Sequence, residues 1–138
     1  MRVHQEILSL RGKPRGLYDF TEQLAAVVQH SLVRTGLCSL FLRHTSAGLL
    51  LQENADPAVL RDLTRWVETL APESAGYEHS QEGPDDMPGH LRAVLTRQSE
   101  TIPVTGGRLA LGTWQGVYLY EHRARANARE VVVTIVGE

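Results

Sequence analysis

The chain has 138 residues, of which 42% are hydrophobic and 22% charged, and its formal net charge is −2. This length predicts one domain over residues 1–138, and the balanced charge offers no electrostatic footprint for nucleic acid or an anionic membrane. The single Cys38 excludes an internal disulfide and a cysteine-based zinc site. No apolar segment approaches the roughly 20 residues of a spanning helix, and no signal peptide is evident. We therefore expect a cytoplasmic protein.

The first third of the chain predicts strands on either side of one helix. Residues 2–10 alternate loosely between apolar and polar side chains, as a strand does. A helix is expected to begin near residues 19–21, and Gly36 suits its C-terminal end. The apolar runs at 37–44 and 47–52 then predict two more strands.

The rest of the chain predicts two further helices and a run of strands. Asp56-Pro57 suits a helix start, because Asp is a favoured N-cap and Pro fits the first turn. The buried face of this helix is expected to carry Leu60, Leu63, Val67 and Leu70. A polar loop at 71–86 precedes a short helix at 87–97, which Asp86 is expected to cap. Four strands are expected to follow, near 101–104, 108–111, 117–122 and 130–136, with Gly106-Gly107 as a hairpin turn.

Consecutive strands joined by short turns, with helices kept apart from them, predict an α+β fold. Three of the predicted strands end in a polar residue on the same side as their apolar residues. These residues are His44, Glu53 and Glu121, which share strand parity with neighbouring leucines and valines. Taken singly, each is explained as well by a hydrogen-bonded core residue or a turn. Together they predict a polar pocket at the strand ends, closed by the loop at 77–90.

That loop carries His79, His90 and four carboxylates within fourteen residues, without helical or strand periodicity. Histidine beside carboxylate is typical of metal sites and proton-transfer sites. A solvated acidic loop is the competing interpretation. The segment Gly112-Thr-Trp-Gln-Gly116 adds Trp114 and Gln115, where two glycines permit a bulge or a close backbone approach.

Four segments of the chain resemble the YjbQ family, and the resemblance covers nearly the whole sequence. They are Arg43-His-Thr-Ser-Ala47, Glu53-Asn-Ala-Asp-Pro57, residues 79–90 (HSQEGPDDMPGH) and residues 107–122 (GRLALGTWQGVYLYEH), where Gly-Thr-Trp-Gln is close to the family signature. The chain departs from the usual pattern at Ser80 and Gly89. The resemblance implies two packed sheets in a β-sandwich with two to three helices, a homotrimer, and a secondary thiamine-phosphate synthase activity. Apolar residues on both faces of 37–42 and 131–136 also favour an oligomer.

The leading hypothesis is a metal-dependent enzyme acting on a small phosphorylated metabolite. His44, His79 and His90 are expected to bind zinc with one open position, with Mg²⁺ as the alternative metal. Glu121, Glu53 and Glu82 are candidates for proton transfer. Residues expected to bind the substrate are Arg43, Thr45, Ser46, Trp114, Gln115 and Arg123. A non-catalytic module that binds a metal or metabolite is the rival hypothesis, and a purely structural protein ranks last.

Overall fold

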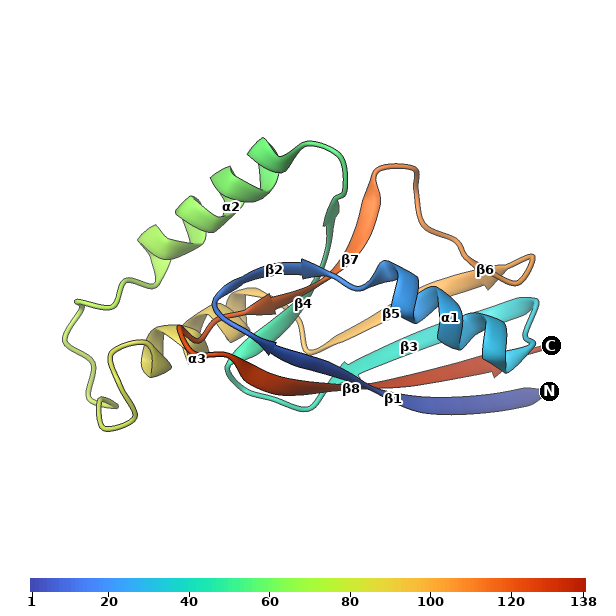
Figure 1. Cartoon of the computed structure of the whole chain (residues 1–138), viewed down its shortest axis with the longest axis horizontal. Coiled ribbons are helices and arrows are strands. Elements are labelled where there is room, and N and C mark those ends of the chain that lie inside the picture. The colour runs from blue at the N-terminus through green and yellow to red at the C-terminus, as the bar shows by residue number, and fades with distance from the viewer.

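The computed structural model describes residues 1–138 and contains three helices and two antiparallel sheets (Figure 1). The helices are α1 (Thr21–Ser31), α2 (Pro57–Leu70) and α3 (Asp86–Leu95). The strands are β1 (Arg2–Lys13), β2 (Gly16–Asp19), β3 (Thr35–Leu42), β4 (Ala47–Glu53), β5 (Ser99–Thr105), β6 (Arg108–Leu109), β7 (Gln115–Glu121) and β8 (Asn127–Gly137).

One sheet has five strands in the order β1-β8-β3-β5-β6, and the other has three in the order β2-β7-β4. Every paired neighbour is antiparallel. The predicted α+β class with two sheets and two to three helices is therefore confirmed. The chain passes from one sheet to the other several times. For example, β7 in the small sheet is followed directly by β8 in the large one.

A continuous core of buried aliphatic side chains lies on the inner face of the large sheet. Helix α1 covers part of this face with Leu24, Val27 and Val28, which are all at most 1% exposed and recur at helical spacing. Alternate residues of β8 point into the same core at Val131, Val133 and Ile135. Cys38 is a free thiol in this core, and burial raises its pKa to about 12, which disfavours the reactive thiolate.

The first helix and its surroundings differ from the sequence prediction. Helix α1 ends at Ser31, and Leu32 follows in a left-handed conformation (φ 61). Gly36 lies in β3 rather than after the helix, opposite Gly137 of β8. A side chain there would collide with the Val136 carbonyl group, so glycine permits a close approach of two strands. The short β2 was not predicted, because four residues are too few for a periodic signal.

Helix α2 begins as predicted, with the Asp56 carboxylate accepting a hydrogen bond from the Ala58 backbone N–H. Its predicted buried face is only partly buried, with Leu60 and Leu63 half-buried. Only Val67 is fully buried, and Leu70 is 49% exposed. Trp66 is also exposed, and the helix lies to one side of the sheets (Figure 1). The apolar stripe of α2 is thus partly uncovered within one chain.

The outer face of the large sheet is also uncovered. Strand register aligns Val3, Val136 and Leu37 in one row and Ile7, Val132 and Phe41 in another. Four of these side chains are at least half exposed, namely Val3 (70%), Ile7 (52%), Leu37 (51%) and Phe41 (53%). Two apolar rows on one flat face form a larger patch than scattered surface residues would.

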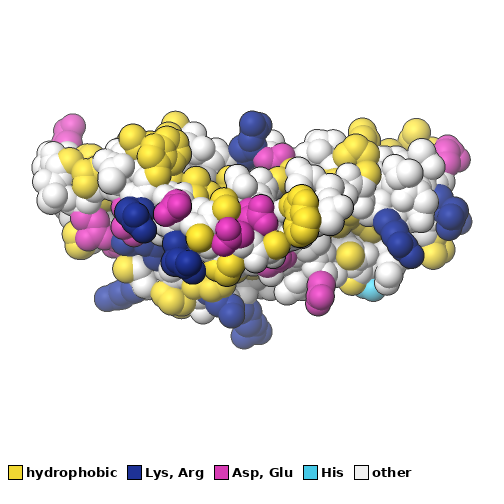
Figure 2. Space-filling model, turned by 90° about the horizontal axis from the view of Figure 1, so that it is seen from above, with side chains coloured by type: hydrophobic (Ala, Val, Ile, Leu, Met, Phe, Trp, Pro, Cys, Tyr) yellow, Lys and Arg dark blue, Asp and Glu magenta, His cyan; other side chains and the backbone are white.

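The remaining surface mixes residue types. On the face seen from above, basic, acidic and apolar side chains are interspersed (Figure 2). None of the three helices combines the length and the apolar character needed to cross a membrane.

A buried histidine lies where β7 ends. His122 has no exposed surface and contacts the ring of Tyr120. Its Nε2 lies 3.3 Å from the Thr96 hydroxyl, while its Nδ1 has no partner. Burial, helped by the positive charges of Arg92 and Arg129, lowers the pKa of His122 to about 3. The imidazole is therefore neutral in the folded protein.

We predict that His122 makes the protein sensitive to acid. Between its unfolded pKa, about 6.5, and its folded pKa, the unfolded chain binds a proton that the folded chain excludes. The free energy of unfolding should therefore fall by about 1.4 kcal/mol per pH unit as the pH drops below about 6. Urea denaturation from pH 7.5 to 4.5 should show a shallower dependence in His122→Gln than in the wild type. Equal slopes would contradict the assignment.

Candidate metal centre

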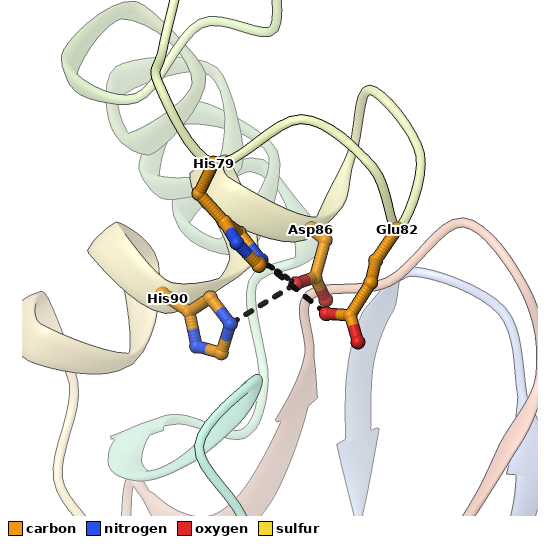
Figure 3. Close-up of side chains that lie close together, drawn as sticks. All are labelled: His79, Glu82, Asp86 and His90. Carbon is orange, nitrogen blue, oxygen red and sulfur yellow. Dashed lines mark hydrogen bonds and ion pairs between the residues drawn. The ribbon is translucent and has the colours of Figure 1, made fainter.

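Four side chains from the loop before α3 and from α3 itself converge on one point (Figure 3). His79 Nε2 lies 2.6 Å and His90 Nε2 lies 3.0 Å from the same carboxylate oxygen, Asp86 Oδ2. Glu82 Oε2 lies 3.3 Å from His79 Nε2. One ligand atom from each of the four residues lies within 4.8 Å of all the others. Two imidazoles and two carboxylates therefore face a common centre.

The local structure explains this convergence. Asp86 and His90 are four residues apart in α3, so both side chains lie on one face of the helix. The loop turns at Gly83, whose φ is 105, and brings His79 and Glu82 back towards that face. Asp86 was predicted to cap the helix. The structure instead places it in the first turn, where its carboxylate binds the two histidines.

The charges of the cluster depend on one another. The hydrogen bond to Asp86 raises the pKa of His79, although partial desolvation opposes this. Burial alone would raise the pKa of Asp86, but hydrogen bonds from His79 and the nearby positive charges lower it below its usual value. The Asp86 side chain is only 4% exposed. It is therefore a buried carboxylate that remains ionised because cationic or donor groups surround it.

A second hydrogen bond fixes the orientation of His90. Its Nδ1 lies 2.9 Å from the Thr45 carbonyl oxygen, which can only accept, so Nδ1 carries a proton. The other ring nitrogen, Nε2, then faces Asp86. This arrangement is the one in which a backbone carbonyl holds a histidine with its Nε2 free to bind a metal.

Arg123 holds the loop in place from the other side. Its guanidinium binds Asp85 Oδ2 at 2.9 Å, Asp86 Oδ1 at 2.8 Å and the Glu82 carbonyl oxygen at 3.1 Å. The predicted role of Arg123 was to bind substrate. Its contacts instead tie the loop to the segment between β7 and β8, and they orient Asp86 for its two histidines.

Glu121, the first candidate for proton transfer, is committed to another partner. It is 1% exposed, and both of its carboxylate oxygens bind the Arg129 guanidinium, at 2.8 and 2.6 Å. Arg129 also donates to the Ser46 hydroxyl at 3.0 Å, so Ser46 supports the same ion pair. Glu121 is therefore an inward-facing carboxylate, as the sequence predicts. Its two oxygens are held by Arg129 in a buried ion pair.

Glu53 lies far from the cluster. Strand register pairs Glu53 with Gln115 and Ala47 with Glu121, so Glu53 and Glu121 are at opposite ends of the β4–β7 pair, about 20 Å apart. The Glu53 carboxylate accepts hydrogen bonds from the Ala55 and Asp56 backbone N–H groups and shapes the turn into α2. The expected single pocket joining all three strand ends therefore does not form.

Two of the predicted substrate-binding residues lie at that same distant end. Gln115 Oε1 accepts a hydrogen bond from the Gly112 backbone N–H, which closes the turn before β7. Trp114 is 64% exposed. Both residues are therefore separated from the histidine cluster within one chain.

His44 lies in the loop that approaches α3, but its ring points elsewhere. Its Nε2 accepts a hydrogen bond from the Glu130 backbone N–H at 2.9 Å, and burial lowers its pKa. The structure thus brings together His79 and His90 of the predicted histidines, and leaves His44 outside the group. Arg43, in the same loop, is half exposed and only loosely paired with Glu130 at 3.8 Å, so its guanidinium is available to an anion.

The member of the cluster that sequence reasoning missed is Asp86. Its spacing of four residues from His90 on a predicted helix was the signal that could have identified it. A surface cavity of about 490 Å³ adjoins the cluster and is lined by Tyr77, Glu78, His79 and Met87. The cluster is therefore accessible to a small molecule through His79.

We predict that Glu121→Gln destabilises the fold rather than altering chemistry alone. The substitution leaves the Arg129 guanidinium buried without a counter-charge, which costs about 3–5 kcal/mol of unfolding free energy. Chemical denaturation measures the change, and Glu130→Gln on the exposed side of β8 is the matched control. Wild-type stability in Glu121→Gln would show that the ion pair is dispensable.

Comparison with known proteins identifies the relatives of this chain. The model of the UPF0047 protein YjbQ-like family matches residues 6–138. A UPF0047 protein from Synechocystis is 56% identical over 99% of this chain and 94% of its own length. YjbQ from Salmonella typhimurium is 43% identical over 98% and 99% of the two chains.

Solved structures agree with these sequence matches. A YbjQ-like protein of unknown function from Sulfolobus solfataricus has a TM-score of 0.91 at 25% identity, covering 99% of both chains. A YjbQ/UPF0047 protein from Clostridium acetobutylicum has a TM-score of 0.87 at 32% identity, covering 95% of this chain and 99% of the other. Because the fold is shared and the matches cover nearly the full length of the chain, the chain belongs to the UPF0047 family of YjbQ-like proteins.

Proposed function

We propose that the protein is a metal-dependent enzyme acting on a small phosphorylated molecule, with its metal held by His79, Asp86 and His90. The observation that carries the proposal is the environment of His90. In the neutral form of the ring, whose Nδ1 proton is used by the Thr45 carbonyl, the Nε2 lone pair faces the Asp86 carboxylate, 3.0 Å away. Two lone pairs repel unless a proton or a cation lies between them. A divalent cation satisfies both, and the Nε2 of His79 as well.

The donor set favours zinc over magnesium. Imidazole nitrogens and carboxylate oxygens are both common zinc ligands, whereas Mg²⁺ prefers oxygen ligands and water. Atoms bound to one zinc ion at about 2.0–2.2 Å lie roughly 3–4 Å apart. The present separations of 2.6–3.3 Å between nitrogens and carboxylate oxygens therefore require only small side-chain rotations.

When bound, a divalent metal supplies positive charge that polarises a phosphoryl or carbonyl oxygen. The chain supplies the remaining groups. Glu82 is the most exposed member of the cluster, with a side chain 66% exposed, and is free to accept a proton from a substrate or from water. Arg43 offers a bidentate contact to a phosphate. The cavity beside Tyr77 and His79 has room for a small metabolite.

The family resemblance supports thiamine-phosphate synthesis as one candidate reaction, beside phosphate chemistry on other small molecules. That reaction joins two phosphorylated rings and releases pyrophosphate, so it requires charge neutralisation at the leaving group. The rival proposal is a trimeric module that binds a metal and a metabolite without turnover. The exposed carboxylate of Glu82 favours the enzyme, because a purely structural site is closed by its ligands.

We predict that one equivalent of Zn²⁺ binds through this cluster. Calorimetric titration of metal-stripped protein without a histidine tag should lose that equivalent in His79→Ala, His90→Ala and Asp86→Asn. His44→Ala is the control, since its ring binds the Glu130 backbone and should retain the metal. Unchanged binding in His90→Ala would overturn the proposed site, and loss of zinc in His44→Ala would instead support the predicted three-histidine set.

One further variant, Glu82→Gln, separates the enzyme from the binding module. For an enzyme, Glu82→Gln should retain zinc but lower kcat by about 10²-fold, the usual effect of removing a general base. The assay panel contains thiamine-pathway phosphates and simple phosphoesters. If the zinc-loaded wild type turns over none of them while still binding one, the module is the correct description.

We also propose that the protein is a cytoplasmic homotrimer. The apolar rows on the outer face of the large sheet and the partly uncovered stripe of α2 are the surfaces available for assembly. Burying four half-exposed apolar side chains per chain is favourable by about 1 kcal/mol or more for each. The reduced, buried Cys38 is compatible with a reducing compartment.

We predict that light scattering at micromolar concentration reports about three chains. Phe41→Glu places a charge in the apolar row and should shift the mass towards one chain. Ser39→Glu lies on the same face but in the polar row beside Thr134, and should have a weaker effect. A wild-type mass of one chain would contradict the proposed assembly.

A further inference from the structure

A second group of metal-binding side chains lies between β1 and α1. His4 and Glu6 are two residues apart in β1 and share one face of the strand. His30 reaches the same point from the last turn of α1, which packs against β1. The three ligand atoms all lie within 4.8 Å of one another. These residues form a cluster separate from the one at α3, and the proposed function does not use them.

Both imidazoles approach the same carboxylate oxygen. His4 Nε2 lies 2.6 Å and His30 Nδ1 lies 2.7 Å from Glu6 Oε2. The two rings are nearly perpendicular, at 75°, with their centroids 6.5 Å apart. Two nitrogens and one oxygen therefore converge from different directions, which is the donor set of two histidines and a carboxylate found in open zinc sites.

The position of the cluster suits a reversible surface site. His4 and Glu6 side chains are about one-third exposed, at 31% and 30%, and His30 is 60% exposed. An ion could enter from solvent without opening the core. Regular strand and helix geometry holds the three Cα atoms, so little ordering would be required on binding. With three protein ligands, at least one coordination position would remain for water or another donor.

We propose that His4, Glu6 and His30 form a second site for a divalent transition metal, of which zinc is the representative. β1 is the edge strand of its sheet and has no neighbour on its outer side, so the open position remains accessible. The competing explanation is a hydrogen-bonded group in which both rings donate protons to Glu6. The two explanations differ in whether metal binds and in which residues it requires.

The test uses a background in which the cluster at α3 is removed. Metal-stripped, tag-free His79→Ala/His90→Ala protein is titrated with Zn²⁺ by calorimetry and with Co²⁺, whose visible absorption reports nitrogen and oxygen ligation. We expect one equivalent to bind in this background. Adding His30→Ala or Glu6→Gln should weaken that binding at least tenfold. Glu22→Gln, elsewhere on α1, is the matched control and should leave it unchanged.

Each outcome decides the proposal. No binding in the background protein, or equal binding after His30→Ala and Glu6→Gln, overturns it and leaves a hydrogen-bonded group. Because His30 is exposed, its substitution should preserve the fold, which far-UV circular dichroism verifies. This result does not depend on the proposed function. If the proposed metal site at α3 fails, the wild type and the background protein bind equal amounts of zinc.

Discussion

The buried ion pair between Glu121 and Arg129 joins the two sheets at the end where the histidine cluster lies. Glu121 ends β7 in the small sheet, and Arg129 lies near the start of β8 in the large one. Arg129 also holds Ser46, which precedes β4. Three chain segments are thereby fixed by one guanidinium. The pair is enclosed, so its charges cannot be satisfied by water, and its geometry must be maintained for the fold to persist.

The candidate site is built outward from this pair. The segment after Glu121 supplies Arg123, which binds Asp85 and Asp86, and the segment before Ser46 supplies the Thr45 carbonyl that orients His90. Asp86 and His90 are therefore each positioned by a neighbour that the sheets hold in place. Such support from outside the ligand set is what keeps a metal site preorganised.

The two histidine clusters differ in ways that suit different roles. The one at α3 contains a buried carboxylate, adjoins a cavity and is supported by Arg123. The one between β1 and α1 is more exposed and has no enclosed carboxylate. A small molecule has a surface cavity to occupy beside the first. The proposed chemistry is therefore placed at the first cluster and the proposed reversible metal binding at the second.

The sequence by itself determined the α+β class, the hairpin at Gly106-Gly107, the Asp56 cap and the concentration of histidines and carboxylates in the loop at 77–90. These features depend on local patterns that span a few residues. Tertiary structure decided which polar residues meet. Glu53 and Glu121 have the same parity, but register puts them at opposite ends of one strand pair. Asp86, expected to cap α3, instead meets His79 and His90, and Glu121, expected to transfer protons, instead pairs with Arg129, because the folding of each loop decides which side chains face each other.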